Sequence, residues 1–126
     1  MNIRAVTTSK APQPIGPYRQ AVSCGDMLFI SGQIPLDPQS GKIIGVTIEE
    51  QARQALANVI AIAASPGQGM YTIVKTTVYL SDINHFQAFN TVYESMFGAV
   101  CPARSVVAVA GLPRDVLIEV EAVACR

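Results

Sequence analysis

The chain has 126 residues, of which 50% are hydrophobic and 14% charged, with nine basic and nine acidic side chains. Its length fits a single domain spanning residues 1–126. The formal net charge is zero and the basic residues form no cluster, which disfavours nucleic acid or anionic lipid as a partner. The charged fraction is below the roughly 25% typical of soluble proteins, so we expect part of the surface to contact another subunit.

The cysteines and the apolar runs indicate the cellular location of the protein. Cys24, Cys101 and Cys125 are odd in number, far apart and in no CxxC pair. This pattern favours free thiols over disulfides or a zinc site. No apolar run approaches the roughly 20 residues that span a bilayer, and Met1–Arg4 leads into Thr7–Ser9 without an apolar signal core. These features predict a cytoplasmic protein.

The first half of the sequence predicts a hairpin, a loop and a helix. Ala21–Cys24 and Met27–Ser31 flank a Gly-Asp turn, as in a short hairpin, and Pro35–Gly41 forms a loop. Thr47 and Glu50 have the spacing of a capping box, so the first helix should start there. Apolar residues follow at helical spacing until Pro66-Gly67 ends the run.

The second half predicts a strand, a helix and two further strands. Tyr71–Leu80 is rich in β-branched residues and favours a strand. Ser81 or Asp82 should cap a second helix that ends near Gly98. Its apolar stripe consists of Phe86, Phe89, Tyr93 and Met96. The last strands are expected at about Ser105–Ala110 and Val116–Ala124, joined by the turn Gly111–Asp115.

The order β-β-α-β-α-β-β indicates an α+β fold, because each helix has only one apolar stripe to bury. A mixed sheet with both helices on one face satisfies this pattern. The other face of the sheet would then remain bare and need a partner, which agrees with the low charged fraction.

Two carboxylates interrupt the apolar pattern of the last strand. Alternation places Glu119 and Glu121 on the same face, where an edge or solvent-exposed position would also explain them. Arg104 opens the preceding strand, and a hairpin between the two strands would bring Arg104 and Glu119 into one cleft. The pair could form a plain salt bridge or a site for a ligand carboxylate, which a guanidinium holds through two parallel hydrogen bonds.

Other polar and aromatic residues are weaker candidates. Tyr18 follows a rigid Gly-Pro bend that could present its ring to a ligand or to the core, and Ser31 precedes Gly32. Asn90 lies beside the apolar stripe of the second helix, where an amide more often bridges elements. A single histidine, His85, allows no His-rich metal site, and no phosphate-binding glycine motif occurs.

Four segments in order resemble the RidA/YjgF family of reactive intermediate deaminases. They are Ile15–Tyr18, Ser31–Pro35, Pro102–Ser105 and Ile118–Ala122. The resemblance covers nearly the whole chain, as one RidA-like domain. It implies a chorismate-mutase-like α+β fold assembled as a homotrimer, with the sheets in a central barrel and three ligand clefts between neighbouring subunits.

Members of the archetypal subgroup of this family hydrolyse 2-imino acids such as 2-iminobutanoate and 2-iminopropanoate, which pyridoxal-phosphate-dependent dehydratases release, to 2-oxo acids and ammonia. The resemblance implies no cofactor and no metal. Arg104 matches the carboxylate-binding arginine of the family and Glu119 its water-orienting glutamate. The positions that match the rest of the cleft are Tyr18, Ser31, Gly32, Asn90 and Val106.

Several positions depart from the family pattern. Val106 stands where a cysteine is frequent, Ala108 where a glutamate is common, and Cys101 where an aromatic residue precedes the Pro-Ala-Arg-Ser segment. An altered entrance would change which imino acids fit. The loop Ser65–Met70 also differs from the commoner loop, and no functional account of it emerges from the sequence.

Two other classes of function stay open. Similar proteins have also been described as ribonucleases acting on single-stranded RNA and as holdase chaperones, although zero net charge and few aromatic residues argue against specific RNA binding. A sensor could also use Arg104 to bind 2-oxo acids without turnover. Glu119 separates these alternatives, because hydrolysis needs it and carboxylate binding does not.

Overall fold

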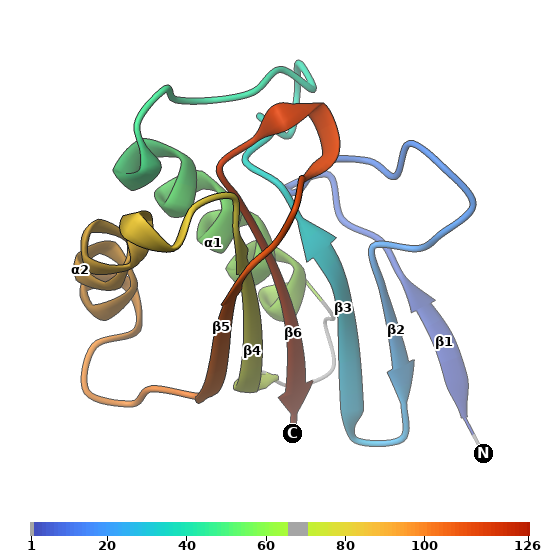
Figure 1. Ribbon diagram of the computed structural model, residues 1–126. Coiled ribbons are helices and arrows are strands. Elements are labelled where there is room, and N and C mark those ends of the chain that lie inside the picture. The colour runs from blue at the N-terminus through green and yellow to red at the C-terminus, as the bar shows by residue number, and fades with distance from the viewer. Residues whose placement is uncertain (1, 66–70) are drawn as a thin grey trace.

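The computed structural model describes residues 2–65 and 71–126. One six-stranded sheet in the order β1-β2-β3-β6-β4-β5 carries the helices α1 and α2 on one side (Figure 1). The elements are β1 Ile3–Val6, β2 Ala21–Cys24, β3 Met27–Gln33, α1 Ile48–Ala64, β4 Thr72–Leu80, η1 Ile83–His85, α2 Phe86–Phe97, β5 Ala103–Ala108, η2 Pro113–Asp115 and β6 Ile118–Cys125. The expected α+β architecture, with two helices on one face of a mixed sheet, is confirmed.

Helix α1 begins with the capping box that the sequence predicts. The hydroxyl of Thr47 accepts a hydrogen bond from the backbone amide of Glu50 at 3.2 Å, and the Glu50 carboxylate accepts one from the Thr47 amide at 3.1 Å. These backbone hydrogen bonds hold the pKa of Glu50 below its usual value. The helix ends at Ala64; the predicted stop at Pro66-Gly67 lies outside the described residues.

The second helix ends at the predicted signal, but the prediction that Ser81 or Asp82 caps it is wrong. Asp82 instead caps the short η1 turn by accepting a hydrogen bond from the Asn84 amide at 2.9 Å, and α2 begins at Phe86, after His85, without a side-chain cap. Gly98 ends α2 with a φ of 64°, a conformation that favours glycine. Phe89 and Tyr93 of the predicted stripe are buried against α1 and the sheet.

The predicted early hairpin is confirmed, but the first strand was not predicted from the sequence. β2 and β3 pair antiparallel around Gly25, whose φ is 58°. β1 then pairs antiparallel with β2 at the edge of the sheet. Three of its four residues are exposed, so it has no buried periodic face that a pattern could reveal.

The predicted hairpin between the last two strands is wrong. β5 pairs with β4 in parallel, and β6 runs antiparallel between β3 and β4. The connection through η2 therefore carries the chain past the end of β4. Arg114 and Asp115 in this turn both have a φ of 56°, the left-handed region that side chains other than glycine seldom adopt. β5 consequently lies at the edge of the sheet and is separated from β6 by one strand.

The two faces of the sheet differ in what they carry. Ile118, Val120, Ala122 and Ala124 of β6 are buried against the helices, while the intervening residues face the opposite side, as the alternation predicts. No described helix covers that side. It exposes large apolar groups, including Phe29 at 49% and Val107 at 44% of their surface.

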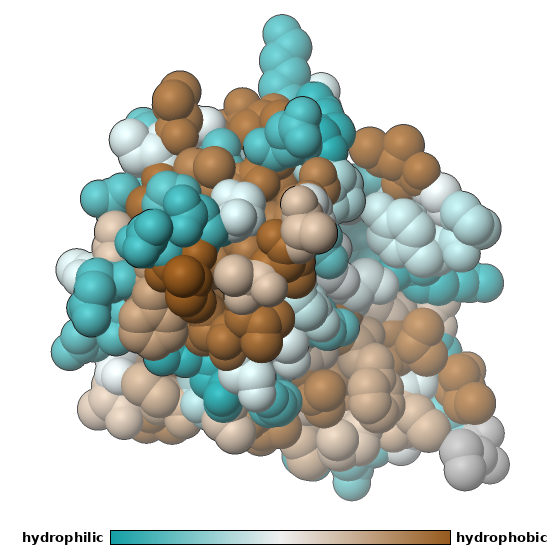
Figure 2. All heavy atoms as spheres, in the orientation of Figure 1, coloured by the Kyte–Doolittle hydropathy of each residue, from teal (hydrophilic) through white to brown (hydrophobic). Residues whose placement is uncertain are grey.

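The molecular surface is correspondingly apolar. In the space-filling view, hydrophobic residues cover much of the surface in sight, and strongly hydrophilic residues lie mainly around its margin (Figure 2). No helix in the described part of the chain combines the length and apolar character needed to cross a membrane. Burial of such a surface against another protein would be favourable in water.

Candidate active site

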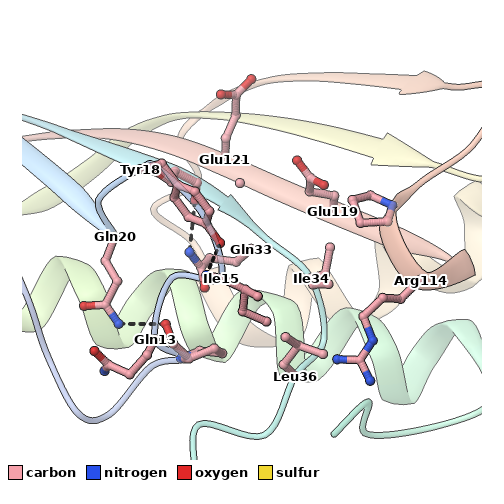
Figure 3. Close-up of a pocket in the computed structure, with 14 residues that line it drawn as sticks. Gln13, Ile15, Tyr18, Gln20, Gln33, Ile34, Leu36, Arg114, Glu119 and Glu121 are labelled. Carbon is pink, nitrogen blue, oxygen red and sulfur yellow. Dashed lines mark hydrogen bonds between the residues drawn. The ribbon is translucent and has the colours of Figure 1, made fainter. Parts of the chain in front are cut away.

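A cavity of about 670 Å³ opens beside β3 and β6, and we call it the carboxylate cavity (Figure 3). Its walls come from the segment before β2, the end of β3, the η2 turn and the bare face of β6. Its lining residues include Ile15, Tyr18, Ser31, Gly32, Ile34, Leu36, Arg114, Glu119 and Glu121. The cavity thus gathers four of the residues predicted from the sequence, namely Tyr18, Ser31, Gly32 and Glu119.

A bulge in β3 shapes one wall of the cavity. The pairing of β3 with β6 shifts register between Ile30 and Gln33, so that Ser31 and Gly32 leave the ladder. Ser31 is instead bonded to the segment before β2. Its amide donates to the carbonyl of Gln20 at 2.9 Å, and its hydroxyl donates to the carbonyl of Arg19 at 2.6 Å. The bulge therefore opens the backbone beside β6.

Gly32 provides the space that the Glu119 side chain occupies. A Cβ atom at position 32 would overlap the carboxylate of Glu119 and lie only 2.9 Å from its Cδ atom. Real Cβ contacts of this kind essentially never occur, so either the backbone or the glutamate would have to move. Glycine at this position lets the carboxylate lie directly over the bulge.

The segment before β2, which carries Tyr18, is held in place by the buried side-chain amide of Gln20. The side chain of Gln20 accepts from the amide of Thr8 at 2.7 Å and donates to the carbonyls of Thr8, Ala11 and Pro12. Tyr18 is 51% exposed, and its hydroxyl accepts from the Ile15 amide at 3.4 Å. The rigid bend therefore presents the Tyr18 ring at the cavity rather than to the core.

Glu119 and Glu121 project from β6 on the same side (Figure 3). The Tyr79 hydroxyl donates a hydrogen bond to Glu121, whereas no described residue donates one to the carboxylate of Glu119. Burial, followed by the nearby charge of Glu121, raises the pKa of Glu119 above its ordinary value. A carboxylate with a raised pKa is a better proton acceptor near neutral pH.

The rest of the lining is mostly apolar. Ile15, Ile34 and Leu36 lie on the side of the cavity away from β6 (Figure 3). Arg114 contributes a cation at the rim, and its Nη1 donates to the carbonyl of Gly41 at 2.9 Å. The cavity can therefore take a small molecule that has an apolar tail and a polar centre near Glu119.

Arg104 lies in a different place, which we call the arginine pocket. This hollow of about 430 Å³ is lined by α2, β5 and the loop that connects them. Nη1 of Arg104 donates to the Asn90 side-chain oxygen at 2.7 Å, and its guanidinium carbon is 4.8 Å from the centre of the Tyr93 ring. The rings of Phe86 and Phe89 lie 5.6 Å away.

The expectation that Arg104 and Glu119 share one cleft within the chain is wrong. Arg104 is opposite Thr76 of β4, whose hydroxyl contacts Tyr93 on the helix side of the sheet. Glu119 is opposite Tyr79 of β4 and faces the bare side. With β4 between the two strands and the side chains on opposite faces, one chain cannot bring them together.

The remaining predicted residues fall near the arginine pocket. Asn90 lines it and bridges α2 to β5 through Arg104, the bridging role that is common for such an amide. Val106 packs against the hydrophobic core and lines neither cavity. Cys101 lines the arginine pocket and is exposed.

Sequence reasoning missed three residues that shape the carboxylate cavity: Gln20, Tyr79 and Arg114. The contact of Tyr79 with Glu121 could be found only from the pairing of β4 with β6, which is not local in the sequence. Gln20 gives no pattern because its partners are backbone atoms. Within residues 2–65 and 71–126, no group of three or more His, Cys, Asp or Glu side chains could hold a metal ion.

Known proteins that are similar in sequence show which family the chain belongs to. The family model described as endoribonuclease L-PSP matches residues 8–126. The 2-iminobutanoate/2-iminopropanoate deaminase of Salmonella typhimurium is 48% identical over 126 residues, which cover 98% of each chain. The chain belongs to the RidA/YjgF family. A RutC family protein of Pyrococcus horikoshii is 50% identical over 121 residues, 96% of each chain.

Solved structures of the RidA/YjgF family have the same fold. The YjgF gene product of Escherichia coli matches with a TM-score of 0.91 and 47% identity over 98% of each chain. E. coli TdcF, solved with bound serine, matches with a TM-score of 0.91 and 45% identity over 98% of each chain. The α+β fold is therefore shared with these solved structures.

Proposed function

We propose that the protein hydrolyses 2-imino acids, such as 2-iminobutanoate and 2-iminopropanoate, to 2-oxo acids and ammonia without a metal or organic cofactor. The observation that carries this proposal is the Glu119 carboxylate, which lies over Gly32 in the carboxylate cavity with no described hydrogen-bond donor. It is available to bind a water molecule. Relatives at 47–48% identity that are named 2-iminobutanoate/2-iminopropanoate deaminase support the same reaction.

In the reaction, Glu119 accepts a proton from water while the water oxygen forms a bond to the imine carbon. The electron pair of the C=N bond moves to nitrogen and gives a carbinolamine. Glu119 then returns this proton to the amine nitrogen, and the C–N bond breaks with its electron pair leaving on ammonia. The hydroxyl oxygen forms the carbonyl while its own proton passes to Glu119 and on to solvent. An iminium carbon is already electrophilic, so positioning a water and one base is sufficient help. The apolar side of the cavity would hold the aliphatic side chain.

We propose further that the complete site forms between copies of the chain in a homotrimer. Arg104 of one copy would bind the substrate carboxylate, and the carboxylate cavity of its neighbour would supply Glu119. Three observations support this arrangement: the apolar bare face, the position of β5 at a sheet edge, and the separation of Arg104 from Glu119 within one chain. The serine bound to TdcF is itself a 2-amino acid with a carboxylate.

A coupled assay tests the reaction. A pyridoxal-phosphate threonine dehydratase generates 2-iminobutanoate, and the release of 2-oxobutanoate is followed with and without this protein. We expect faster release in its presence. Unchanged release at equimolar protein would overturn the proposed hydrolysis.

A subunit-mixing experiment tests the shared site. Arg104→Ala and Glu119→Gln are each expected to be inactive alone. Co-expression in equal amounts should restore about a quarter of the wild-type activity per site, because one site in four then combines an intact arginine with an intact glutamate. If isolated mixed trimers showed no recovery, the site would not be shared between copies.

A 2-oxo acid sensor remains the second candidate, because the arginine pocket is well ordered by itself. Asn90 and three aromatic rings hold Arg104 without any contribution from Glu119. Binding of 2-oxobutanoate without imine hydrolysis would favour this alternative. Cleavage of single-stranded RNA is less compatible with the carboxylate cavity, since Glu119 and Glu121 would repel a phosphate backbone.

A further inference from the structure

Glu121, the second carboxylate of the cavity, accepts a hydrogen bond from Tyr79 that has no role in the proposed reaction. Tyr79 on β4 lies directly opposite Glu119 in the strand register, yet its hydroxyl donates to Glu121, two residues along β6. Both carboxylates line the carboxylate cavity and also a smaller adjoining hollow of about 300 Å³ that includes Tyr79. The pair is therefore asymmetric, with one anchored and one unanchored carboxylate.

We propose that Tyr79 divides the roles of the two carboxylates, so that Glu121 is held as a hydrogen-bond acceptor and Glu119 is left free to take up and release the proton. Tyr79 and Glu121 are positioning residues in this scheme, because neither needs to touch the substrate. The inference rests on the proposed function for its catalytic meaning. The assignment of the proton within the pair can be tested without the reaction.

The electrostatics follow from this geometry. The hydrogen bond from Tyr79 occupies the Glu121 carboxylate and leaves that of Glu119 without a described donor. The charge of Glu121 then opposes ionisation of Glu119, and together with burial it raises the pKa of Glu119. The same hydrogen bond, with burial, raises the pKa of Tyr79 to about 12, so the phenol stays a donor throughout the physiological range.

The other charged or titratable groups near the pair do not provide this asymmetry. Arg114 lines the cavity but donates to the carbonyl of Gly41. The Tyr18 hydroxyl accepts from a backbone amide on the opposite wall. Lys75, on the same face of β4, donates to Ser105 of β5 at 3.1 Å. Arg104 faces the helix side within the chain and would approach only from a neighbouring copy in the proposed trimer.

Carboxyl-detected NMR on protein labelled with ¹³C at the glutamate Cδ tests the assignment in the assembled protein without substrate. Glu119→Gln and Glu121→Gln identify the two signals. In the wild type, we expect Glu119 to titrate above the ordinary glutamate range. Glu121→Gln should lower the midpoint of Glu119, because it removes the neighbouring charge. An ordinary Glu119 midpoint, or one that Glu121→Gln leaves unchanged, would overturn the proposal.

Tyr79→Phe tests the role of the hydroxyl while keeping the ring. We expect the Glu119 midpoint to shift and the Glu119 titration to become biphasic, as in a pair that shares its proton. Tyr71→Phe is the matched control, because Tyr71 precedes β4 at its other end and contacts Arg126. An unchanged Glu119 titration in Tyr79→Phe, or an equal change in Tyr71→Phe, would overturn the role of Tyr79.

The pH dependence of kcat provides the catalytic readout. If hydrolysis requires ionised Glu119, the acidic limb of the pH profile of kcat should lie at lower pH in Glu121→Gln than in the wild type. The same limb should broaden in Tyr79→Phe. An acidic limb at the same pH in all three proteins would overturn the positioning role. If the wild type hydrolyses no imine, the proposed function fails, while the NMR titration still decides which carboxylate holds the proton.

Discussion

The carboxylate cavity and the arginine pocket hold their central side chains in opposite ways. Arg104 projects from a regular strand onto a regular helix, where Asn90 and three aromatic rings contact it. Glu119 lies over a bulge, between a loop and a strained turn, and accepts no hydrogen bond from a described residue. The cation is fixed in advance, whereas the carboxylate is left free to bind water.

This difference suits the chemistry that we propose for each. A group that only binds and orients a carboxylate benefits from rigid support. A group that exchanges a proton benefits from a shifted pKa and an unoccupied coordination position. The two regions also lie on opposite faces of one sheet, so within one chain they cannot contact the same small ligand. If they contribute different functions, substitutions in each should have separable effects.

Replacement of Glu119 by Gln should have the largest effect on turnover. The amide keeps the size of the side chain but loses its basicity, so imine hydrolysis should slow by about a hundredfold or more. Affinity for 2-oxobutanoate should stay within about twofold, because the arginine pocket is untouched. A freshly generated imine and isothermal titration calorimetry measure these two quantities. Equal loss of binding and turnover would remove the distinction between the regions.

Replacement of Arg104 by Lys should weaken carboxylate binding. An ammonium keeps the charge but cannot donate to Asn90 and make two parallel bonds to a carboxylate in the same geometry. Loss of one charged hydrogen bond, worth about 1.5–3 kcal/mol, would reduce affinity roughly ten- to a hundredfold. Arg53→Lys, on an exposed position of α1, is the control. Normal affinity in a folded Arg104→Lys protein would contradict the assigned role.

Replacement of Gly32 by Ala should disturb the carboxylate cavity alone. The new methyl group would overlap the end of the Glu119 side chain, which is flexible and would swing away, so the free energy of unfolding should change little. Turnover should fall because the carboxylate is displaced, while 2-oxo acid binding should change less. Gly111→Ala is the matched control, because a Cβ there meets no atom within 4 Å. Similar turnover of the two variants would disprove the close-approach argument, and thermal unfolding checks that both are folded.

The smallest expected effect is on the pH dependence of stability. The folded-state pKa of Glu119 is raised, so ionisation of this group costs stability above that pKa, and the cost disappears as pH falls below the unfolded-state value. Glu119→Gln should therefore gain stability relative to the wild type as pH rises through the carboxyl range. Thermal melts between pH 4 and 8 measure the difference. A gain at low pH that disappears at neutral pH would contradict the sign.

Local features of the fold could be predicted from the sequence because neighbouring residues determine them. The capping box of α1, the end of α2 at Gly98 and the alternation of β6 depend on residues within a few positions of one another. The order of the strands in the sheet depends on residues far apart in the sequence, and it could not be predicted in this way. The short connection after β5 suggested a hairpin, but two consecutive residues with positive φ take the chain past β4 instead.

The same limit applies to the candidate site. Resemblance to a family indicated Glu119, Gly32, Ser31 and Tyr18, and the structure gathers these four in one cavity. It could not show that Arg104 faces the opposite side of the sheet within a chain, because that depends on strand order and side-chain direction. The contacts of Gln20 and Tyr79 join distant segments and leave no local pattern.

The buried amide of Gln20 attaches the cavity wall to the beginning of β2. Four hydrogen bonds of the segment before β2 converge on this one side chain, which immediately precedes Ala21, the first residue of β2. Releasing this segment would deprive the Gln20 amide and several backbone groups of their partners at the same time, so these contacts stabilise the wall as a set rather than one by one.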